Sequence, residues 1–330
     1  MNTSDFKKYL KVFVVLLIVL LAIFSGYNLS KQAAVTKVEI SEEDYNLNNK
    51  LTITASFYPV YIMALNLTKD VPGVELAVLA PFDVGCIHDI QFSTSDLKLL
   101  EKSDIFIING LGMENYLSRV YENIPGLKVV DSTANLNLAE FEDEHEQNPG
   151  NENDHEQNHD HPNPHTWLSV TLAIEQVQEI AKQLCLLDPT HKEQYTENAA
   201  EYVAKLEALR AKIKAELENL SSKNIVVFED TFAYFAQEFG LDVAAVIQRE
   251  HGSEPSAREL SQAIGKIKEN RVKAIFISDE SNRAAAETIA KETAAEVYLL
   301  DPATSGPPEA DSYLKAMERN LQILQEALAE

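Results

Sequence analysis

The sequence predicts an α/β protein with two halves, each built on a mostly parallel sheet, and one long helix between them. Three features predict this fold. Short apolar runs alternate with helical patterns from residue 51 onward, the same alternation starts again after residue 222, and an apolar stripe with helical spacing fills the interval. Such alternation is typical of βαβ units, in which a helix carries the chain back so that successive strands run parallel.

The first half contains four apolar runs of strand length, separated by segments with helical periodicity. We expect strands over residues 51–57, 74–79, 104–109 and 128–131. We expect helices over residues 61–67, 95–102 and 113–123. Because strand and helix alternate without a break, this half is expected to form one lobe.

The second half repeats the pattern. We expect strands over residues 224–228, 243–247, 273–278 and 297–300. We expect helices over residues 231–239, 257–270 and 283–293, and a last one from about residue 310. Residues 95–109 and 261–278 share one arrangement, an amphipathic helix followed by a polar turn and a buried strand. That arrangement is common in α/β proteins, so it is compatible with two similar lobes without requiring them.

A long helix is predicted between the halves. Apolar residues recur there at spacings of three or four, which places them on one helix face: Tyr195, Ala199, Tyr202, Leu206, Leu209, Ile213, Leu217 and Leu220. About 28 residues at ~1.5 Å each span about 42 Å, the length of a domain. We expect a rigid linking helix over residues 191–222, between a lobe at 51–190 and a lobe at 223–330. An ordinary packing helix and a coiled coil are the alternatives, and the stripe is short for a coiled coil.

Composition limits the possible functions. The chain has 330 residues, 45% of them hydrophobic, which supplies folded cores and excludes global disorder. The net charge of −24 argues against nucleic acid as a partner, because a phosphate-binding face needs clustered Lys and Arg, and it suits a cation. Two cysteines, Cys86 and Cys185, are too few for a disulfide scaffold or a cysteine zinc finger. Whether they pair with each other stays open.

The first 31 residues resemble a targeting segment. Lys7, Lys8 and Lys11 precede the apolar run 12–24, the layout of a secretory signal with a positive n-region and a short h-region. Uncharged residues continue to Ser30, so an uncleaved membrane anchor is the alternative. In either case the positive-inside rule places the rest of the chain outside the cytoplasm. Residues 32–50 are polar and are expected to be a linker, and no lipobox cysteine follows the apolar run.

Histidines are concentrated in one stretch. Five of the eight histidines lie between residues 145 and 165, and nine carboxylates lie between residues 140 and 160. The segment 140–163 has too few apolar residues to fold, so we expect a disordered loop. Imidazole and carboxylate both bind divalent transition metals, which favours a weak auxiliary metal-binding role for four of the histidines: His145, His155, His159 and His161. A solvated acidic loop with incidental histidines is the alternative.

A tight metal site needs ligands on separate rigid elements, and α/β proteins place ligands beyond the carboxyl ends of their strands. Four residues meet this condition: His88, His165, Glu229 and Asp301. The two histidines belong to the first half and the two carboxylates to the second. Each also has an ordinary explanation, since a single loop histidine is seldom a ligand and an acid after a strand can begin a helix.

Six phrases in order along the chain carry a resemblance to a known family. They are Ser56–Pro59, Gly85–Asp89, Asn163–Trp167, Phe228–Phe235, Glu254–Leu260 and Leu300–Pro302. From about residue 51 to its end the chain resembles the ZnuA-like substrate-binding proteins of ABC transporters for zinc and manganese. The resemblance implies one divalent ion between two Rossmann-like lobes joined by a long helix. It also implies delivery of that ion to a membrane permease powered by a cytoplasmic ATPase.

The resemblance assigns roles to the four candidate ligands. His88 and His165 match the two histidines of the family's first lobe, and Asp301 matches its acidic ligand. Glu229 stands where zinc members usually have His and manganese members usually have Glu. Two imidazoles and two carboxylates favour manganese or iron, whereas the histidine-rich loop resembles zinc members. These two clues conflict, but the wider set of motifs resembles zinc members more closely, so we expect Zn²⁺ as the cargo, with Mn²⁺ or iron as the alternative.

Two other classes of function are alternatives to metal transport. A metallohydrolase would keep three protein ligands, an open water position and a nearby base, and no HExxH or nucleophile-elbow motif occurs in the sequence. A surface adhesin is a second alternative, for which no sequence feature indicates an interaction face. The prediction is a monomeric, non-enzymatic, extracytoplasmic binding protein whose partner is a membrane permease.

Overall fold

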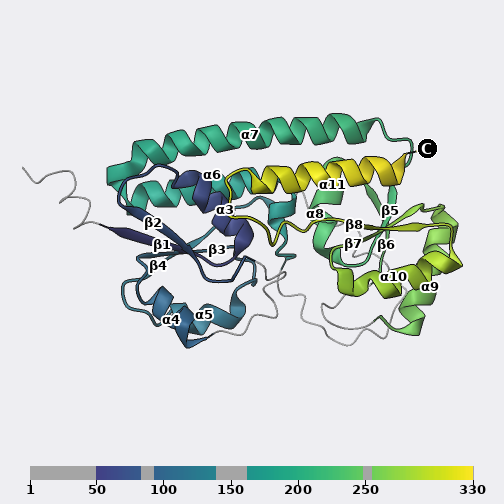
Figure 1. Ribbon diagram of the computed structural model, residues 1–330, viewed down its shortest axis with the longest axis horizontal. Helices are drawn as coiled ribbons and strands as arrows, with labels where there is room; N and C mark the ends of the chain where they lie inside the picture. The colour runs from purple at the N-terminus through teal and green to yellow at the C-terminus, as the bar shows by residue number, and fades with distance from the viewer. Residues whose placement is uncertain (1–49, 83–92, 139–161, 248–254, 330) are drawn as a thin grey trace, which may run out of the picture. The chain divides into compact units, whose positions relative to one another are not determined.

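Each half of the chain forms one parallel sheet, because its apolar runs are joined by helices that return the chain to the same edge. The computed structural model describes residues 50–82, 93–138, 162–247 and 255–329. The strand order is β2-β1-β3-β4 in one sheet and β6-β5-β7-β8 in the other. Figure 1 shows the two sheets, and the strand order is the same in both. The prediction of two similar parallel lobes is confirmed.

The first sheet and its helices follow the expected order. Its strands are β1 (Leu51–Ala55), β2 (Val74–Val78), β3 (Ile105–Ile108) and β4 (Lys128–Asp131). Its helices are α3 (Tyr58–Leu67), α4 (Thr94–Leu100) and the short α5 (Ser118–Tyr121), preceded by the 3₁₀ turn η2 (Asn115–Leu117). The expected helix at 113–123 is therefore shorter than predicted. Gly110, Leu111 and Gly112 have positive φ, so the chain turns sharply before the helix can begin.

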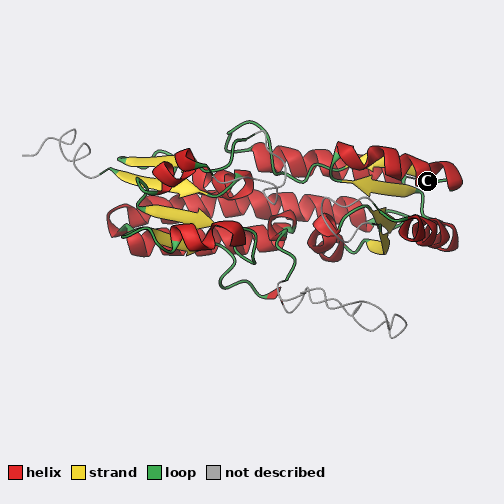
Figure 2. Ribbon diagram, turned by 90° about the horizontal axis from the view of Figure 1, so that it is seen from below, coloured by secondary structure: helices red, strands yellow, loops and turns green. Residues whose placement is uncertain are grey.

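The second sheet repeats this arrangement. Its strands are β5 (Asn224–Val227), β6 (Asp242–Val246), β7 (Ala274–Ile277) and β8 (Glu296–Leu299). Its helices are α8 (Ala233–Phe239), α9 (Ala257–Asn270), α10 (Arg283–Glu292) and α11 (Ser312–Leu328), with the 3₁₀ turns η7 (Asp230–Phe232) and η8 (Glu280–Asn282). Helices flank the strands on both faces (Figure 2). Glu229 and Asp301 both follow the carboxyl ends of strands, as expected.

Two helices lie between the sheets in sequence. The 3₁₀ turn η5 (Thr166–Leu168) leads into α6 (Val170–Leu187), and η6 (Pro189–His191) leads into α7 (Lys192–Glu218). Seven of the eight residues of the predicted stripe are buried along α7, and Leu220 lies beyond its end. Helix α7 contacts α3 and α6 from the first half and α8 and α11 from the second. It is the linking helix that the sequence predicts, and it runs past both sheets (Figure 1).

One hydrophobic core belongs to both lobes. Alternate residues of β3 and β5, such as Ile107 and Val227, point into a single cluster with α6, α7 and α11. The residues between them, such as Phe106 and Val226, point the other way into two smaller cores beneath α4 and beneath α9 and α10. Burial of the shared core therefore holds the lobes together.

Several expectations concern residues outside the described ranges. The targeting segment 1–31, most of the 32–50 linker, His88 and the four histidines of the acidic loop belong to this group, and they stay predictions. Within the described residues, no helix has both the length and the apolar character needed to cross a bilayer.

Candidate metal site

His165 lies at the entrance to η5, between the first sheet and α6. Its side chain is buried, with 2% of the residue exposed. The Asn163 side chain holds it twice: Asn163 Oδ1 lies 2.9 Å from the His165 backbone nitrogen and 2.8 Å from ring Nδ1. The Asn163 amide nitrogen donates to the carbonyl oxygen of Asp230 at 2.9 Å. The ring of His165 is thus fixed before any ligand arrives.

The Asn163 contacts also fix which ring nitrogen of His165 carries the proton. A backbone N–H must donate and a backbone carbonyl must accept, so the amide of Asn163 can face only one way. Its oxygen therefore faces Nδ1, and Nδ1 carries the proton that it donates. The neutral imidazole then has its lone pair on Nε2, which is the arrangement that orients a metal-ligating histidine.

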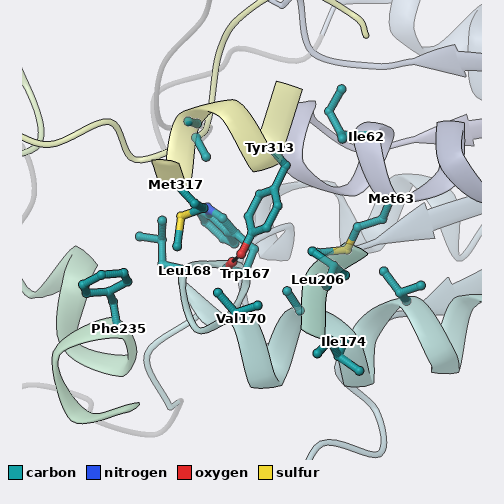
Figure 3. Close-up of a cluster of buried hydrophobic side chains, with 14 of the residues drawn as sticks. Ile62, Met63, Trp167, Leu168, Val170, Ile174, Leu206, Phe235, Tyr313 and Met317 are labelled. Atoms are coloured by element: carbon teal, nitrogen blue, oxygen red, sulfur yellow. Dashed lines mark hydrogen bonds between the residues drawn. The ribbon is translucent and has the colours of Figure 1, made fainter. Parts of the chain in front are cut away.

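Trp167 also contacts the His165 ring. The two rings meet edge to face, with centroids 5.3 Å apart, and Trp167 makes a similar contact with Phe57 at 5.1 Å. Trp167 lies among Leu168, Tyr313 and Met317 in the shared core (Figure 3). The Tyr313 hydroxyl donates to the Trp167 carbonyl oxygen at 2.7 Å. Helix α11 of the second lobe therefore helps to position a residue next to His165.

Hydrogen bonds connect the His165 segment to the segments that carry the two predicted carboxylates. Asn163 bonds to the backbone of Asp230, which follows Glu229. The Trp167 indole Nε1 donates to the carbonyl oxygen of Pro302, which follows Asp301, at 2.9 Å. Each of these two bonds joins a residue of the first lobe to a residue of the second. The segments that carry His165, Glu229 and Asp301 are therefore connected by hydrogen bonds.

Two neighbours hold the Glu229 carboxylate. Glu229 is half-buried at the end of the β5 segment, and Asn282 Nδ2 donates to its Oε1 at 3.1 Å. The Ser278 hydroxyl donates to Oε2. Ser278 and Asn282 both follow β7, the strand beside β5. The Glu229 carboxylate therefore has a fixed orientation at the carboxyl edge of the second sheet.

Asp301 is also oriented by its own lobe. Its Oδ1 accepts from the Ala303 backbone nitrogen at 2.8 Å, and its Oδ2 accepts from Arg319 Nη2 at 2.7 Å. The buried Asn320 side chain bonds to the backbone nitrogen and carbonyl of Asp301, each at 2.8 Å. Each carboxylate oxygen has a second lone pair, so these bonds leave Asp301 able to bind a cation.

The structure does not bring a complete set of ligands into one place. Within the described residues, no three His, Cys, Asp or Glu side chains gather closely enough to hold a metal ion. His165, Glu229 and Asp301 therefore do not enclose a site by themselves, and His88 lies outside the described residues. The four-residue set stays a prediction.

Local sequence patterns do not reveal the residues that support the candidate ligands. Ser278, Asn282, Arg319 and Asn320 have no pattern that distinguishes them from ordinary polar residues of loops and helices. Asn163 offered one signal, because its side chain precedes a Pro-His pair, and a short polar side chain there can bond the nearby backbone.

The chain matches a known protein family over most of its length. A family model described as "Zinc-uptake complex component A periplasmic", named ZnuA, matches residues 53–327. The chain belongs to the ZnuA family. This confirms the resemblance that the six sequence phrases indicate. The ZnuA family consists of transport components and is not a class of enzymes.

Two curated members of the ZnuA family show how far the similarity extends. The high-affinity zinc uptake system protein ZnuA of Bacillus subtilis is 28% identical over 327 residues, which cover 98% of each chain. The zinc-binding lipoprotein AdcA of Streptococcus pneumoniae is 29% identical over 283 residues, which cover 84% of this chain and 56% of AdcA. This chain therefore spans just over half the length of AdcA.

A solved structure agrees with the ZnuA assignment. The substrate-binding protein (SBP) FpvC of Pseudomonas aeruginosa in complex with Ni²⁺ superposes with a TM-score of 0.71 at 29% identity, covering 84% of this chain and 97% of FpvC. The same protein has also been solved in complex with Mn²⁺, with a TM-score of 0.70. The fold of this ZnuA-family chain is thus one on which proteins bind divalent transition metals.

Proposed function

We propose that this chain is the extracytoplasmic metal-binding component of an ABC importer, and that Zn²⁺ is its cargo. Its membership of the ZnuA family and its likeness to metal-bound proteins support this function. One observation on this chain carries the proposal. Asn163 accepts a hydrogen bond from Nδ1 of His165, so this buried imidazole, when neutral, carries its lone pair on Nε2. A histidine fixed in this way suits metal ligation.

We propose His88, His165, Glu229 and Asp301 as the ligands. Two imidazoles from the first lobe and two carboxylates from the second would bind the ion between the lobes. Two carboxylates balance the charge of a divalent cation, which lowers the cost of taking it out of water. The bonds of Asn282 to Glu229 and of Arg319 to Asp301 orient the carboxylates, as supporting contacts do in metal sites.

The choice of zinc follows from the order of metal affinities. Imidazole and carboxylate ligands both bind zinc more tightly than manganese along the Irving–Williams series, and the second carboxylate narrows this preference for zinc without reversing it. The names of the two curated relatives above include zinc, which supports the same choice. Manganese or iron is the alternative, because the carboxylate of Glu229 replaces a nitrogen ligand with oxygen.

The remaining parts of the chain fit the same function. We propose that residues 1–31 export the chain and, if they are retained, anchor it to the membrane. We propose that the segment 140–163 binds metal weakly through His145, His155, His159 and His161 and so raises its concentration near the site. The partner is a membrane permease that accepts the ion.

Metal content and competition test this function. The full chain, purified without added metal, would be analysed for bound elements, and zinc and manganese would then be competed against each other in one buffer. We expect one tightly bound ion per chain and a lower dissociation constant for zinc. Absence of any stoichiometric metal would overturn the proposed function, and tighter binding of manganese would replace zinc by the alternative cargo.

A further inference from the structure

Glu114 has a buried carboxyl group and is not one of the proposed metal ligands. The residue is 2% exposed. Its Oε1 accepts from the Ser56 hydroxyl and the Asn109 backbone nitrogen, each at 2.8 Å, and its Oε2 accepts from the Gly110 backbone nitrogen at 3.0 Å. Burial raises the pKa of Glu114 to about 7, and these hydrogen bonds oppose the rise. Three donors converge on one carboxylate at the carboxyl edge of the first sheet.

These bonds hold a turn that the backbone alone does not favour. Gly110, Leu111 and Gly112 follow β3 with φ values of 97°, 51° and 82°. A Cβ atom on Gly110 would lie 2.1 Å from Asp131 Oδ1, so the turn also passes close to β4. Residues with positive φ persist where surrounding contacts over-determine them. Glu114 supplies such contacts, because it accepts hydrogen bonds from the backbone N–H of Gly110 and of Asn109, the residue before the turn.

Asn109 transmits this arrangement to the His165 segment. Its side-chain Nδ2 donates to the carbonyl oxygen of Pro164 at 2.9 Å, and Pro164 directly precedes His165. Its Oδ1 accepts from Gln176 Nε2 of α6 at 3.1 Å, and Gln176 also donates to the Ser132 hydroxyl at 2.8 Å. Asn109, Gln176 and Ser132 are fully buried. The backbone at His165 is thus set from inside the lobe.

We propose that Glu114 is a positioning residue of the metal site: it fixes Asn109, and Asn109 fixes the Pro164–His165 backbone from which the imidazole ligand projects. This inference rests on the proposed function of His165 as a ligand. Glu114 would not contact the metal. Its effect on binding would come through the geometry of the loop, as with other groups that orient metal ligands.

The ionisation of Glu114 gives this role a pH signature. The groups that bear on its carboxyl are Asp131 of β4, which raises the pKa of Glu114, and the Tyr121 hydroxyl of α5, whose own pKa is raised. Its pKa in the folded protein lies above the ordinary 4.5, so the contribution of Glu114 to the stability of the metal-free protein falls as the pH rises from about 4.5 toward 7. A bound cation favours the ionised carboxylate, and by linkage the metal binds more tightly as the pH rises through 7.

The test compares two buried carboxylates of the same lobe. Glu114→Gln removes the charge and, in either orientation of the amide, places its –NH₂ group against a backbone N–H that also donates. Glu179→Gln is the matched control, because Glu179 is 7% exposed on α6 and bonds to Lys182 and Gln183. Zinc affinity of the full-length chain would be measured by competition with a chromophoric chelator across the range from pH 6 to 8, and thermal unfolding of the metal-free variants would be recorded.

We expect Glu114→Gln to weaken zinc binding by about tenfold or more and to reduce the pH dependence, and Glu179→Gln to keep both. If folded Glu114→Gln binds zinc with the affinity and pH profile of the parent, the inference is overturned. The proposed function would still stand in that case, provided that the parent binds zinc. If Glu114→Gln does not fold, Ser56→Ala removes one hydrogen bond and keeps the carboxylate. It should weaken binding about two- to threefold, and parental affinity in that variant would overturn the inference.

Discussion

The indole of Trp167 donates a hydrogen bond to the carbonyl oxygen of Pro302 at 2.9 Å, and this bond joins the two lobes beside two proposed ligands. Trp167 lies two residues after His165, and Pro302 directly follows Asp301. Trp167 is also the only tryptophan in the sequence. The tryptophan fluorescence of the protein therefore comes from one indole whose ring touches His165.

The position of Trp167 predicts an optical signal for metal binding. Coordination of an ion by His165 polarises the imidazole at the edge of the indole, so we expect tryptophan emission to change and to saturate at one equivalent of zinc. The measurement is a fluorescence titration beside a calorimetric one. Stoichiometric binding by calorimetry with unchanged emission would place the metal away from His165.

Replacing His165 should abolish tight binding. We expect His165→Ala to lower zinc affinity by more than about 100-fold, because removal of a ligand weakens metal binding more than removal of a supporting contact does. His191→Ala is the matched control, since His191 lies outside the site and its Nδ1 pairs with Asp188 Oδ2 at 2.6 Å. Chelator competition would compare the two variants, and equal affinities would show that His165 is not a ligand.

Glu229 should tune the choice of metal. Glu229→His exchanges a carboxylate oxygen for an imidazole nitrogen and removes one negative charge, so affinity for every divalent ion should fall, but less for zinc than for manganese. The measurement is the ratio of zinc to manganese dissociation constants in parent and variant under one buffer. A ratio that is unchanged or moves toward manganese would show that Glu229 does not bind the metal.

The histidine-rich loop should be dispensable for the tight site. A chain that lacks residues 142–161 should keep one tight zinc equivalent and lose weaker ones, because the loop is expected to supply auxiliary ligands. Calorimetric titration distinguishes the two classes of site. Loss of the tight equivalent would mean that the loop contributes a ligand and that the four-residue set is incomplete.

Gly306 should be intolerant of a side chain. Its φ is 145°, and a Cβ there would lie 2.7 Å from the Tyr58 hydroxyl oxygen. The Tyr58 hydroxyl is held in place because it donates to the carbonyl oxygen of Pro307. Gly240 ends α8 with φ of 66° and has open space where a Cβ would go. Gly240→Ala should cost about 1–2 kcal/mol of unfolding free energy from the backbone alone, and Gly306→Ala about 1–3 kcal/mol more. Denaturant unfolding gives both values, and equal losses would contradict the steric argument.

Local sequence signals predicted most of the fold. Helix α9 has the expected limits because Ser256 and Glu259 form a reciprocal N-terminal cap, a signal contained in four adjacent residues. Strand β4 also has its expected limits. The expected helix at 113–123 was too long, because the turn before it depends on Glu114, whose partner Ser56 lies 58 residues earlier. Contacts at that separation are not visible in local periodicity.

The same distinction applies to the site. Glu229 and Asp301 could be proposed as ligands because the ends of strands are encoded locally, and His165 because it opens a helix after a Pro-Asn-Pro segment. The groups that orient them were not identified, because Asn282 meets Glu229 across 53 residues and Arg319 meets Asp301 across 18. An asparagine or arginine on a helix has no sequence feature that reveals such a partner.

The apolar core that belongs to both lobes has a consequence for the whole molecule. Val227 of one lobe and Ile107 of the other lie in the same cluster. Unfolding of either lobe would therefore expose to water apolar side chains of the lobe that remains folded. The lobes therefore denature together as one cooperative unit, and damage on either side lowers the melting temperature of both. Large swings of one lobe against the other would carry the same cost, so the shared core opposes any wide opening between the lobes.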